Sequence, residues 1–307
     1  MLALVADRDA QSGLSRAEVP EPEPRRDEAL VAMRASSLNR GEIRRLAMRE
    51  PGTVPGWDVA GTVVKPAEDG GPPEGARVVG LLDEGAWAER VAVRIGRLAE
   101  LPDEVSFSDA ATLPVAGMTA LRTLALGGLL LHKRVLVTGA AGGVGRLAIQ
   151  LANRAGAHVT GVVGEPRRGE GLQELGANAI LTGLDAEGPP FDLILESAGG
   201  ESLAAALARV GPGGTVVAFG NSSGEETRFD ISSFYRRGGP TMYGFMLFDE
   251  IERGLPARPD LGLLADLVAA GELRTEVSLE TSWADPDEAV AALMQRRVAG
   301  KAVLLFE

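Results

Sequence analysis

The chain of 307 residues contains no cysteine and only two histidines, His132 and His158. Without cysteine it has no disulfides, no thiol nucleophile and no thiolate ligand for zinc or an iron–sulfur cluster. Both histidines flank apolar runs that we interpret as strands, and we therefore expect them at the surface or at strand edges. The sequence thus excludes several common catalytic centres before any motif is considered.

Basic runs and long apolar runs are absent as well. The formal net charge is −12, and no stretch rich in Lys and Arg offers the local footprint that nucleic-acid binding requires. No apolar stretch approaches the roughly 20 residues that cross a bilayer, and the first residues lack the basic, apolar and small-residue order of a signal peptide. We therefore expect a cytoplasmic protein whose partners include neither nucleic acid nor membrane.

What the chain does contain is two different hydrophobic patterns, and its length suits two domains. Up to about residue 112, short apolar runs are cut by Gly and Pro, which predicts a mainly antiparallel β domain. After about residue 113, continuous aliphatic runs alternate with helical periods, which predicts a parallel sheet covered by helices. The predicted strands of this second part are 134–138, 158–163, 179–181, 192–196, 215–219 and 241–247.

A glycine-rich turn joins the first of these strands to an amphipathic helix. In residues 139–145, Gly142 would let a pyrophosphate approach the backbone, and Gly145 would let helix and strand pack closely. Ala140 stands where the usual G-x-G-x-x-G pattern has its first glycine. A tight turn that merely packs is the alternative, but the surrounding strand, helix and second strand favour a dinucleotide site.

The end of the second predicted strand bears on which dinucleotide binds. Glu165 follows Gly164 there, and an acid at this distance favours the free ribose of NAD, whereas an Arg receives the 2′-phosphate of NADP. Pro166 suits the first turn of a helix, which would place Arg167 and Arg168 near the positive end of its dipole unless an anion lies between. We predict NADPH as the cofactor, with NADH less favoured.

Several short motifs together resemble the medium-chain dehydrogenase/reductase superfamily, in its zinc-independent, quinone oxidoreductase-like branch. The resemblance runs almost end to end, over residues 38–42, 55–63, 85–89, 114–120, 138–145 and 300–304. It implies an α/β protein with a GroES-like, β-rich catalytic domain (1–113 and 256–307). It also implies a Rossmann dinucleotide-binding domain (114–255) with a doubly wound parallel sheet.

The resemblance also assigns residues to the site. In zinc-dependent members a Cys falls at Asn39 and a His at Trp57, and neither an amide nor an indole is a suitable zinc ligand, so no metal is expected. Asn39 and Glu42 are implied to be catalytic and to lie beside the nicotinamide. The implied cofactor-binding residues are Asn39, Thr119, Gly142, Gly143, Val144, Gly164, Arg167, Arg168, Phe219, Gly220 and Asn221.

The predicted reaction is hydride transfer from NADPH to a quinone or an α,β-unsaturated carbonyl as the small-molecule electron acceptor. Asn39 could donate an amide N–H to the developing oxyanion, and solvent could supply the proton. An enoyl-thioester reductase, an alcohol or carbonyl dehydrogenase, and a non-catalytic NADP(H)-binding redox sensor remain as alternatives. Residues 241–247 resemble the edge strand through which this superfamily often forms homodimers, and we expect a homodimer.

Overall fold

The computed structural model describes residues 1–306 and divides into two compact units. The first unit is discontinuous and comprises Met1–Met118 with Ile251–Glu307, and the second comprises Thr119–Glu250. Among the described residues, none of the helices has the length and apolar character that a bilayer crossing requires.

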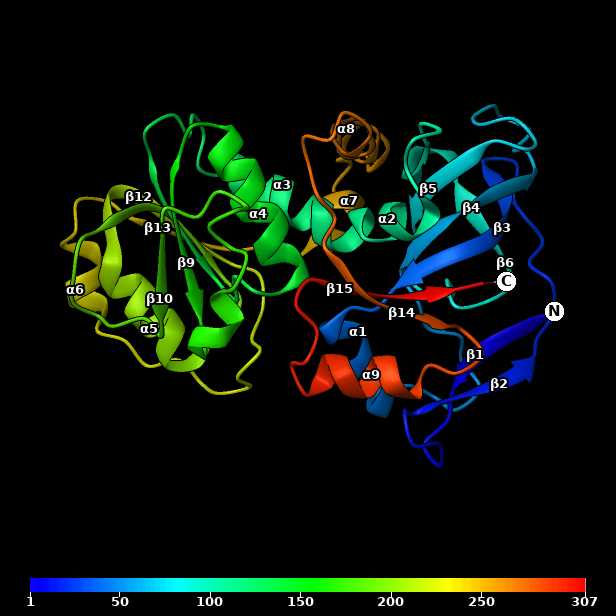
Figure 1. The fold of residues 1–307 in the computed structure, drawn as a ribbon, viewed down its shortest axis with the longest axis horizontal. Helices are drawn as coiled ribbons and strands as arrows, with labels where there is room; N and C mark the ends of the chain where they lie inside the picture. Colours follow the sequence, from blue (N-terminus) through cyan, green and yellow to red (C-terminus); the bar gives the residue numbers. More distant parts are fainter. Residues whose placement is uncertain (307) are drawn as a thin grey trace. The chain divides into compact units, whose positions relative to one another are not determined.

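The first unit is built on a mainly antiparallel sheet in the order β14-β15-β3-β4-β5-β7, with β6 paired to β3 and a separate β1-β2 ladder (Figure 1). Only β14 and β15 pair in parallel within this sheet. Its inward side chains form one apolar core that includes Val31, Val93 and the fully buried Trp87. The strands are β1 (Leu2–Ala6), β2 (Leu14–Glu18), β3 (Glu28–Ser37), β4 (Asp58–Lys65), β5 (Arg77–Leu81), β6 (Arg90–Arg94), β7 (Leu98–Glu100), β14 (Val277–Ser282) and β15 (Lys301–Leu305).

Helices pack against this sheet, and α2, for example, contacts β3 and β4. Of these, α1 begins directly after Asn39, whose backbone is extended, so Asn39 takes the helix N-cap position. The helices of the first unit are α1 (Arg40–Arg45), η1 (Leu46–Met48), η2 (Ile95–Arg97), α2 (Phe107–Ala111), the π-helical turn η3 (Leu113–Gly117), α8 (Arg258–Ala269) and α9 (Asp287–Met294). Two further helices, α3 (Met118–Ala125) and α7 (Leu247–Glu252), cross the boundaries between the units.

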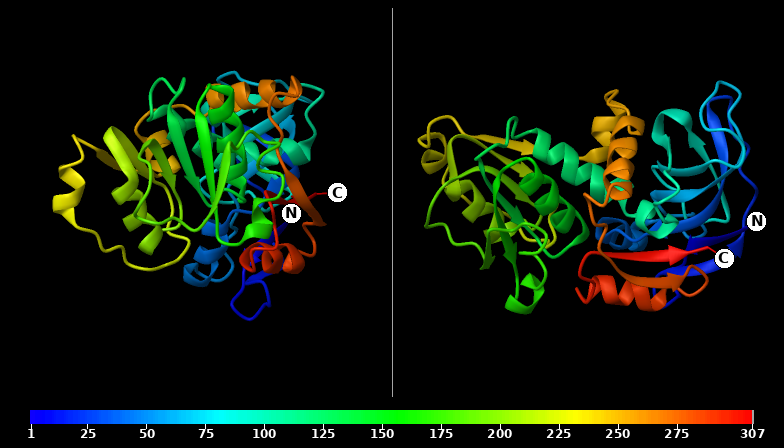
Figure 2. Two further views of the ribbon diagram at one scale, coloured as in Figure 1. Left: turned by 60° about the vertical axis from the view of Figure 1, so that its left-hand side comes forward. Right: turned by 45° about the horizontal axis from the view of Figure 1, so that its top comes forward.

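The second unit contains a six-stranded parallel sheet in the order β10-β9-β8-β11-β12-β13. Chain order therefore reverses between β8 and β11, as in a doubly wound Rossmann sheet. Helices α4 (Gly143–Arg154) and α5 (Gly200–Arg209) lie on opposite faces of this sheet, which twists strongly (Figures 1 and 2). The strands are β8 (Arg134–Thr138), β9 (His158–Val163), β10 (Ala179–Thr182), β11 (Phe191–Glu196), β12 (Val210–Ala218) and β13 (Thr241–Gly244).

These observations confirm the predicted fold class and correct two local predictions. Strand β13 ends at Gly244, because Leu247 already begins helix α7. The helix expected from Pro166 is a four-residue 3₁₀ turn, η4 (Pro166–Gly169), which is too short to carry the dipole on which the anion argument relied. The second unit's remaining helix is α6 (Ile231–Tyr235).

Candidate functional site

The glycine turn after β8 has the tight geometry that a dinucleotide site needs. A methyl group added to Gly145 would lie 2.5 Å from the carbonyl oxygen of Gly139 and 2.7 Å from Cα of Ala140. Glycine at 145 therefore permits the contact between α4 and the turn, as the sequence predicts. At Gly142, φ is −86° and an added Cβ would meet only the Gly139 oxygen, at 3.3 Å. The fold therefore constrains residue 142 less than residue 145, and a ligand close to the backbone would be a further reason for glycine at 142.

Ala140, the departure from the usual glycine pattern, is accommodated by the neighbouring strand. Its side chain is completely buried, and it faces Gly161 of β9, where an added Cβ would lie only 3.1 Å from the Ala140 methyl group. The absence of a side chain at Gly161 thus makes room for the one at Ala140. In this variant of the motif, alanine occupies the turn at position 140 and the glycine that makes room for it lies on β9, at position 161.

The loops that carry the predicted cofactor residues meet at one edge of the parallel sheet. Gly142, Gly143 and Val144 follow β8, the segment 164–168 follows β9, and the segment 219–221 follows β12. Because all these strands are parallel, their carboxyl ends lie on the same side, where ligands of doubly wound sheets bind. Thr119 is buried in α3, and its contact with the cofactor stays a prediction.

A buried glutamate that sequence reasoning missed organises the centre of this edge. Glu196, the last residue of β11, is completely buried and accepts backbone N–H groups of Ala198 (2.9 Å) and Gly199 (3.0 Å) and the hydroxyl of Ser202 (2.9 Å). The hydroxyl of Thr138 donates to it as well (3.3 Å), and because these donors come from β8 and from the segment after β11, the carboxylate fixes the loop that leads into α5. The signal available in the sequence was a lone acid at the end of an otherwise apolar strand.

The loop after β12 is held against this same segment. The amides of Ser222 and Ser223 donate to the carbonyl oxygens of Ser197 (3.0 Å) and Ala198 (2.8 Å). A Cβ at Gly220 would lie 3.0 Å from the Ser197 oxygen. Phe219, Gly220 and Asn221 are thereby fixed next to the sheet edge rather than on a free loop.

The segment after β9, which is predicted to select the dinucleotide, contains an ion pair. Glu165 accepts a hydrogen bond from Nε of Arg167 at 2.7 Å, with both side chains largely exposed. An exposed pair of this kind stabilises the fold by at most about 1 kcal/mol, so an incoming phosphate can compete for Arg167. On the other side of the loop, Arg146 of α4 donates to the carbonyl oxygen of Glu170 at 2.9 Å and ties the loop to the helix.

The predicted catalytic residues lie in the first unit, around a fully buried aspartate, Asp58. Its Oδ2 accepts the hydroxyl of Ser37 and the side-chain N–H of Asn39 (2.8 Å), and its Oδ1 accepts the backbone N–H of Val115 (2.9 Å). Every partner is a donor, which is the environment of an ionised carboxylate. Asp58 is the first residue of β4, so its position is fixed by the sheet.

The charge of Asp58 is balanced by a buried lysine. Lys301, the first residue of β15, is 4% exposed, and its Nζ lies 3.7 Å from Oδ2 of Asp58. The same ammonium donates to Oδ1 of Asn39 (2.7 Å) and to the carbonyl oxygen of Leu38 (3.0 Å). Burial lowers the pKa of Lys301, whereas the carboxylates of Asp58 and Glu42 act to raise it. We refer to Ser37, Asn39, Glu42, Asp58 and Lys301 as the polar cluster.

Glu42 is the second acid of the polar cluster and is also completely buried. Its Oε2 accepts the backbone N–H of Asn39 at 3.2 Å, while its Oε1 has no hydrogen-bond partner within residues 1–306. Burial raises the pKa of Glu42 to about 8, and the charge of Asp58 adds to this rise against the opposing effects of the Asn39 N–H and the Lys301 ammonium. At neutral pH Glu42 is therefore mainly protonated, which leaves Asp58 as the carboxyl group that faces Lys301.

Zinc does not fit these residues. Lys301 places a positive charge 2.7 Å from the amide oxygen of Asn39, and Asp58 is already committed to four donors or cations. Trp57, which has no lone pair for a metal, is buried with the guanidinium carbon of Arg45 5.5 Å from its ring centre. Within residues 1–306, no group of three or more His, Asp or Glu side chains is arranged to hold a metal ion.

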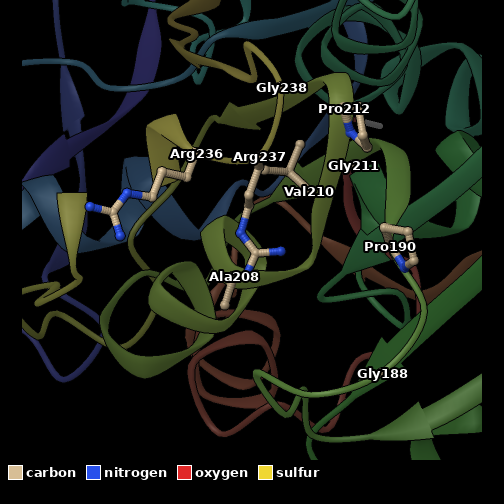
Figure 3. A pocket seen from close by; sticks show the side chains of 9 residues that line it. All are labelled: Gly188, Pro190, Ala208, Val210, Gly211, Pro212, Arg236, Arg237 and Gly238. Carbon is tan, nitrogen blue, oxygen red and sulfur yellow. The ribbon is translucent and has the colours of Figure 1, made fainter. Parts of the chain in front are cut away.

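One surface depression in the second unit is distinct from the predicted cofactor edge. A pocket of about 460 Å³ lies where β12 begins, at Val210 and Gly211, and the side chain of Arg237 extends into it while Arg236 turns away (Figure 3). Strands in a parallel sheet begin at the edge opposite to the one where they end. This pocket is therefore remote from the glycine turn, and we do not assign it to the cofactor.

Comparison with known proteins agrees with this geometry. Residues 143–257 match a family model described as zinc-binding dehydrogenase. The chain is 37% identical to a chloroplast envelope quinone oxidoreductase homolog of Arabidopsis thaliana over 194 residues, or 58% of this chain and 59% of that protein. It is also 31% identical to acrylyl-CoA reductase AcuI of Ruegeria pomeroyi, over 77% of this chain and 79% of that protein. The chain belongs to the medium-chain dehydrogenase/reductase superfamily.

Within this superfamily the chain falls in the quinone oxidoreductase-like branch. A solved mycobacterial structure complexed with NADPH superposes with a TM-score of 0.87 at 25% identity, covering 100% of both chains. The match to the Arabidopsis relative spans about three fifths of that protein's length. The predicted family and fold are thus confirmed, and the match to the zinc-binding family model begins after Asn39 and Trp57, the two positions at which zinc-dependent members have a Cys and a His.

Proposed function

We propose that this protein is an NADPH-dependent, zinc-independent reductase that transfers a hydride to a quinone or an α,β-unsaturated carbonyl. The observation that carries the proposal is the glycine turn, in which a side chain would be less crowded by the fold at Gly142 than at Gly145. The free N–H groups at the start of the 12-residue helix α4 and the missing Cβ suit a pyrophosphate. We assign the dinucleotide half to residues 114–255 and the substrate half to 1–113 with 256–307.

NADPH is favoured over NADH by the basic residues after β9. Arg167 and Arg168 would hold the 2′-phosphate. On binding, Arg167 would leave its exposed ion pair with Glu165 and contact the phosphate instead. Gly142, Gly143 and Val144 would bind the pyrophosphate, and Gly164 would border the adenosine ribose. Support comes from the mycobacterial structural neighbour, which was solved with NADPH.

On the substrate side, this chain positions the acceptor and stabilises its charge. The bound nicotinamide supplies the hydride, which is the difficult chemical step. We propose that Thr119, Phe219, Gly220 and Asn221 orient the nicotinamide and that Asn39 donates a side-chain N–H to the acceptor oxygen on which negative charge develops. Because Glu42 is protonated at neutral pH, Asp58 is the only carboxylate of the polar cluster that is charged near Asn39.

The acceptor class is tested by following NADPH oxidation with a panel of quinones, enones, enoyl thioesters and aldehydes. We expect quinones or enones to have the largest kcat/KM and NADH to be at least about tenfold poorer than NADPH, the effect of roughly 1.4 kcal/mol of phosphate binding. A preference for acrylyl-type thioesters would instead favour the activity named for the AcuI relative. Rapid aldehyde turnover, or tight NADPH binding without oxidation by any acceptor, would contradict the proposal.

A homodimer is the second part of the proposal. Strand β13 is an edge of the parallel sheet, and Met242 on it is 44% exposed. An exposed edge with unpaired backbone groups is a template for pairing with a second copy. The hydroxyl of Tyr243, on the same strand, is held by Glu250 at 2.6 Å and so stiffens the end of the edge. The cytoplasmic location expected from the sequence stays a prediction.

Light scattering at micromolar concentration should give twice the chain mass of 32.0 kDa. Met242→Lys should shift the protein to the monomer mass, because a charged edge residue disfavours strand pairing. Met48→Lys, at a methionine in the first unit that is 75% exposed, is the matched control and should remain dimeric. A monomeric wild-type protein would refute the dimer.

A further inference from the structure

We propose that Lys301 and Asp58 are positioning residues that lock the Asn39 carboxamide in one orientation and polarise it as a hydrogen-bond donor. The inference rests on the proposed function, in which Asn39 donates to the acceptor oxygen. It gives a role to two residues, Asp58 and Lys301, that lie within the family motifs; Lys301 is one of only three lysines in the chain.

The orientation of the amide follows from the charges on either side of it. An ammonium can only donate and a carboxylate in this environment can only accept, so Lys301 must face Oδ1 of Asn39 and Asp58 must face Nδ2. The two distances, 2.7 and 2.8 Å, are those of charge-assisted hydrogen bonds. Turning the amide over would bring donor against donor and acceptor against acceptor. Asp58 uses one N–H of Nδ2, and we assign the other, which also acts on the buried Glu42 carboxyl, to the substrate oxygen.

The same contacts strengthen the remaining N–H as a donor. The Lys301 ammonium withdraws electron density from the amide oxygen, and successive hydrogen bonds polarise one another in a buried environment. Lys301 is 4% exposed and Asp58 is fully buried, so water screens neither charge effectively. Asn39 itself is only partly buried and lies at the open side of the polar cluster.

The sheet holds these three residues in register. Asp58 begins β4, Lys301 begins β15, and Asn39 follows β3, which pairs with both of those strands. The backbone N–H of Leu38 also donates to the carbonyl oxygen of Ala302 at 2.9 Å, directly beside the two side chains. Asp58 and Lys301, which together clamp the Asn39 amide, are thus held by adjacent strands. Rigid strands position a functional group more precisely than loops do.

A double-mutant cycle separates positioning from a merely structural role. Asn39→Ala should lower kcat by about 100- to 1,000-fold, the usual effect of losing one oxyanion donor. Lys301→Met should lower kcat by about 10- to 100-fold in the wild-type background. In the Asn39→Ala background, Lys301→Met should change kcat by less than about twofold, because its effect passes through the amide. The KM for NADPH should stay within about twofold in Lys301→Met.

Two further measurements keep the test decisive if Lys301→Met folds poorly. The charge-neutral double variant Asp58→Asn with Lys301→Met avoids an uncompensated buried charge, and it should fold while turning over as slowly as Lys301→Met alone. The side-chain amide signals of Asn39 in a nitrogen–proton correlation spectrum should move in both variants, which reports the clamp without any substrate.

The outcomes are distinct. Equal losses from Lys301→Met in both backgrounds, or wild-type turnover by the charge-neutral double variant, would overturn the positioning role and leave the proposed reductase activity standing. Unchanged turnover in Asn39→Ala would remove the oxyanion role itself, and the positioning role with it. Absence of oxidation with any acceptor would instead be a failure of the proposed function.

Discussion

Replacing Glu42 with glutamine should make the first unit more stable at alkaline pH and remove a large part of its pH dependence. Glu42 is completely buried, and its pKa in the folded protein is raised to about 8, first by burial and then by Asp58. In the unfolded chain its pKa returns to the ordinary value near 4.5. Glutamine has nearly the same shape as the protonated acid but cannot ionise.

The direction of the effect follows from proton binding. Between about pH 4.5 and pH 8 the folded protein holds the Glu42 proton and the unfolded chain does not, so the stability from this group is full below pH 4.5 and is lost as pH rises through 8. The loss amounts to roughly 3 to 5 kcal/mol at about 1.4 kcal/mol per pKa unit. Lys301 has the opposite effect on stability. Because its pKa is lowered in the folded protein, the unfolded chain binds the Lys301 proton more tightly, and the contribution of this group to stability rises as the pH rises.

Guanidinium unfolding at several pH values measures this difference. Trp57, Trp87 and Trp283 are the only three tryptophans and all lie in the first unit, so tryptophan fluorescence reports the unfolding of that unit. The stability of Glu42→Gln relative to wild type should rise from pH 5 to pH 8 and level off above it. Glu104→Gln, at an exposed glutamate of the same unit, is the control. A constant difference between Glu42→Gln and wild type across this range would contradict the buried protonated acid.

The second large effect is expected in the glycine turn, where two alanine substitutions should behave differently. Gly145→Ala places a methyl group 2.5 Å from the Gly139 oxygen, which forces α4 away from β8. Overpacking of this kind costs about 1 to 3 kcal/mol, and the displaced helix should bind NADPH at least about 100-fold more weakly. Calorimetry should therefore show a lower melting temperature for the second unit, and NADPH fluorescence titration should show the lost affinity.

Gly142→Ala is the matched counterpart. Its added methyl group meets only the Gly139 oxygen at 3.3 Å, and the backbone there already suits alanine. The fold should keep its stability to within about 1 kcal/mol, whereas NADPH should bind about 10- to 100-fold more weakly because the methyl group occupies space needed by the pyrophosphate. Wild-type affinity in Gly142→Ala would show that the pyrophosphate does not cross residue 142.

The second unit was predictable from sequence to a large extent. Its strands are buried on both faces, so they appear as continuous aliphatic runs, and the glycine turn joins one of them to a helix with a clear 3.6-residue period. The predictions failed where the signal was local and weak. Pro166 suggested a helix, but only a 3₁₀ turn forms before the chain bends toward β10. Strands β2 and β14 have no apolar run that would mark them in the sequence, because charged and polar residues alternate along them.

Only part of the polar cluster could be predicted from the sequence. The family resemblance pointed to Asn39 and Glu42 as site residues, and it covered Asp58 and Lys301 within motifs without giving either a role. Asp58 and Lys301 are 243 positions apart, and no periodicity or spacing in the chain connects them. Their contact exists because β15 returns to pair with β3, which already pairs with β4.

The glycine turn and the absence of cysteine were determined by the sequence alone, because each depends only on residue types. The protonation and the side-chain orientation within the polar cluster were decided by the tertiary structure. Whether Glu42 holds a proton depends on burial and on Asp58, and which way the Asn39 amide faces depends on Lys301. Desolvation and charge pairing depend on neighbouring residues that are distant in the sequence and that the sheet brings together. They therefore cannot be read from the residue types along the chain.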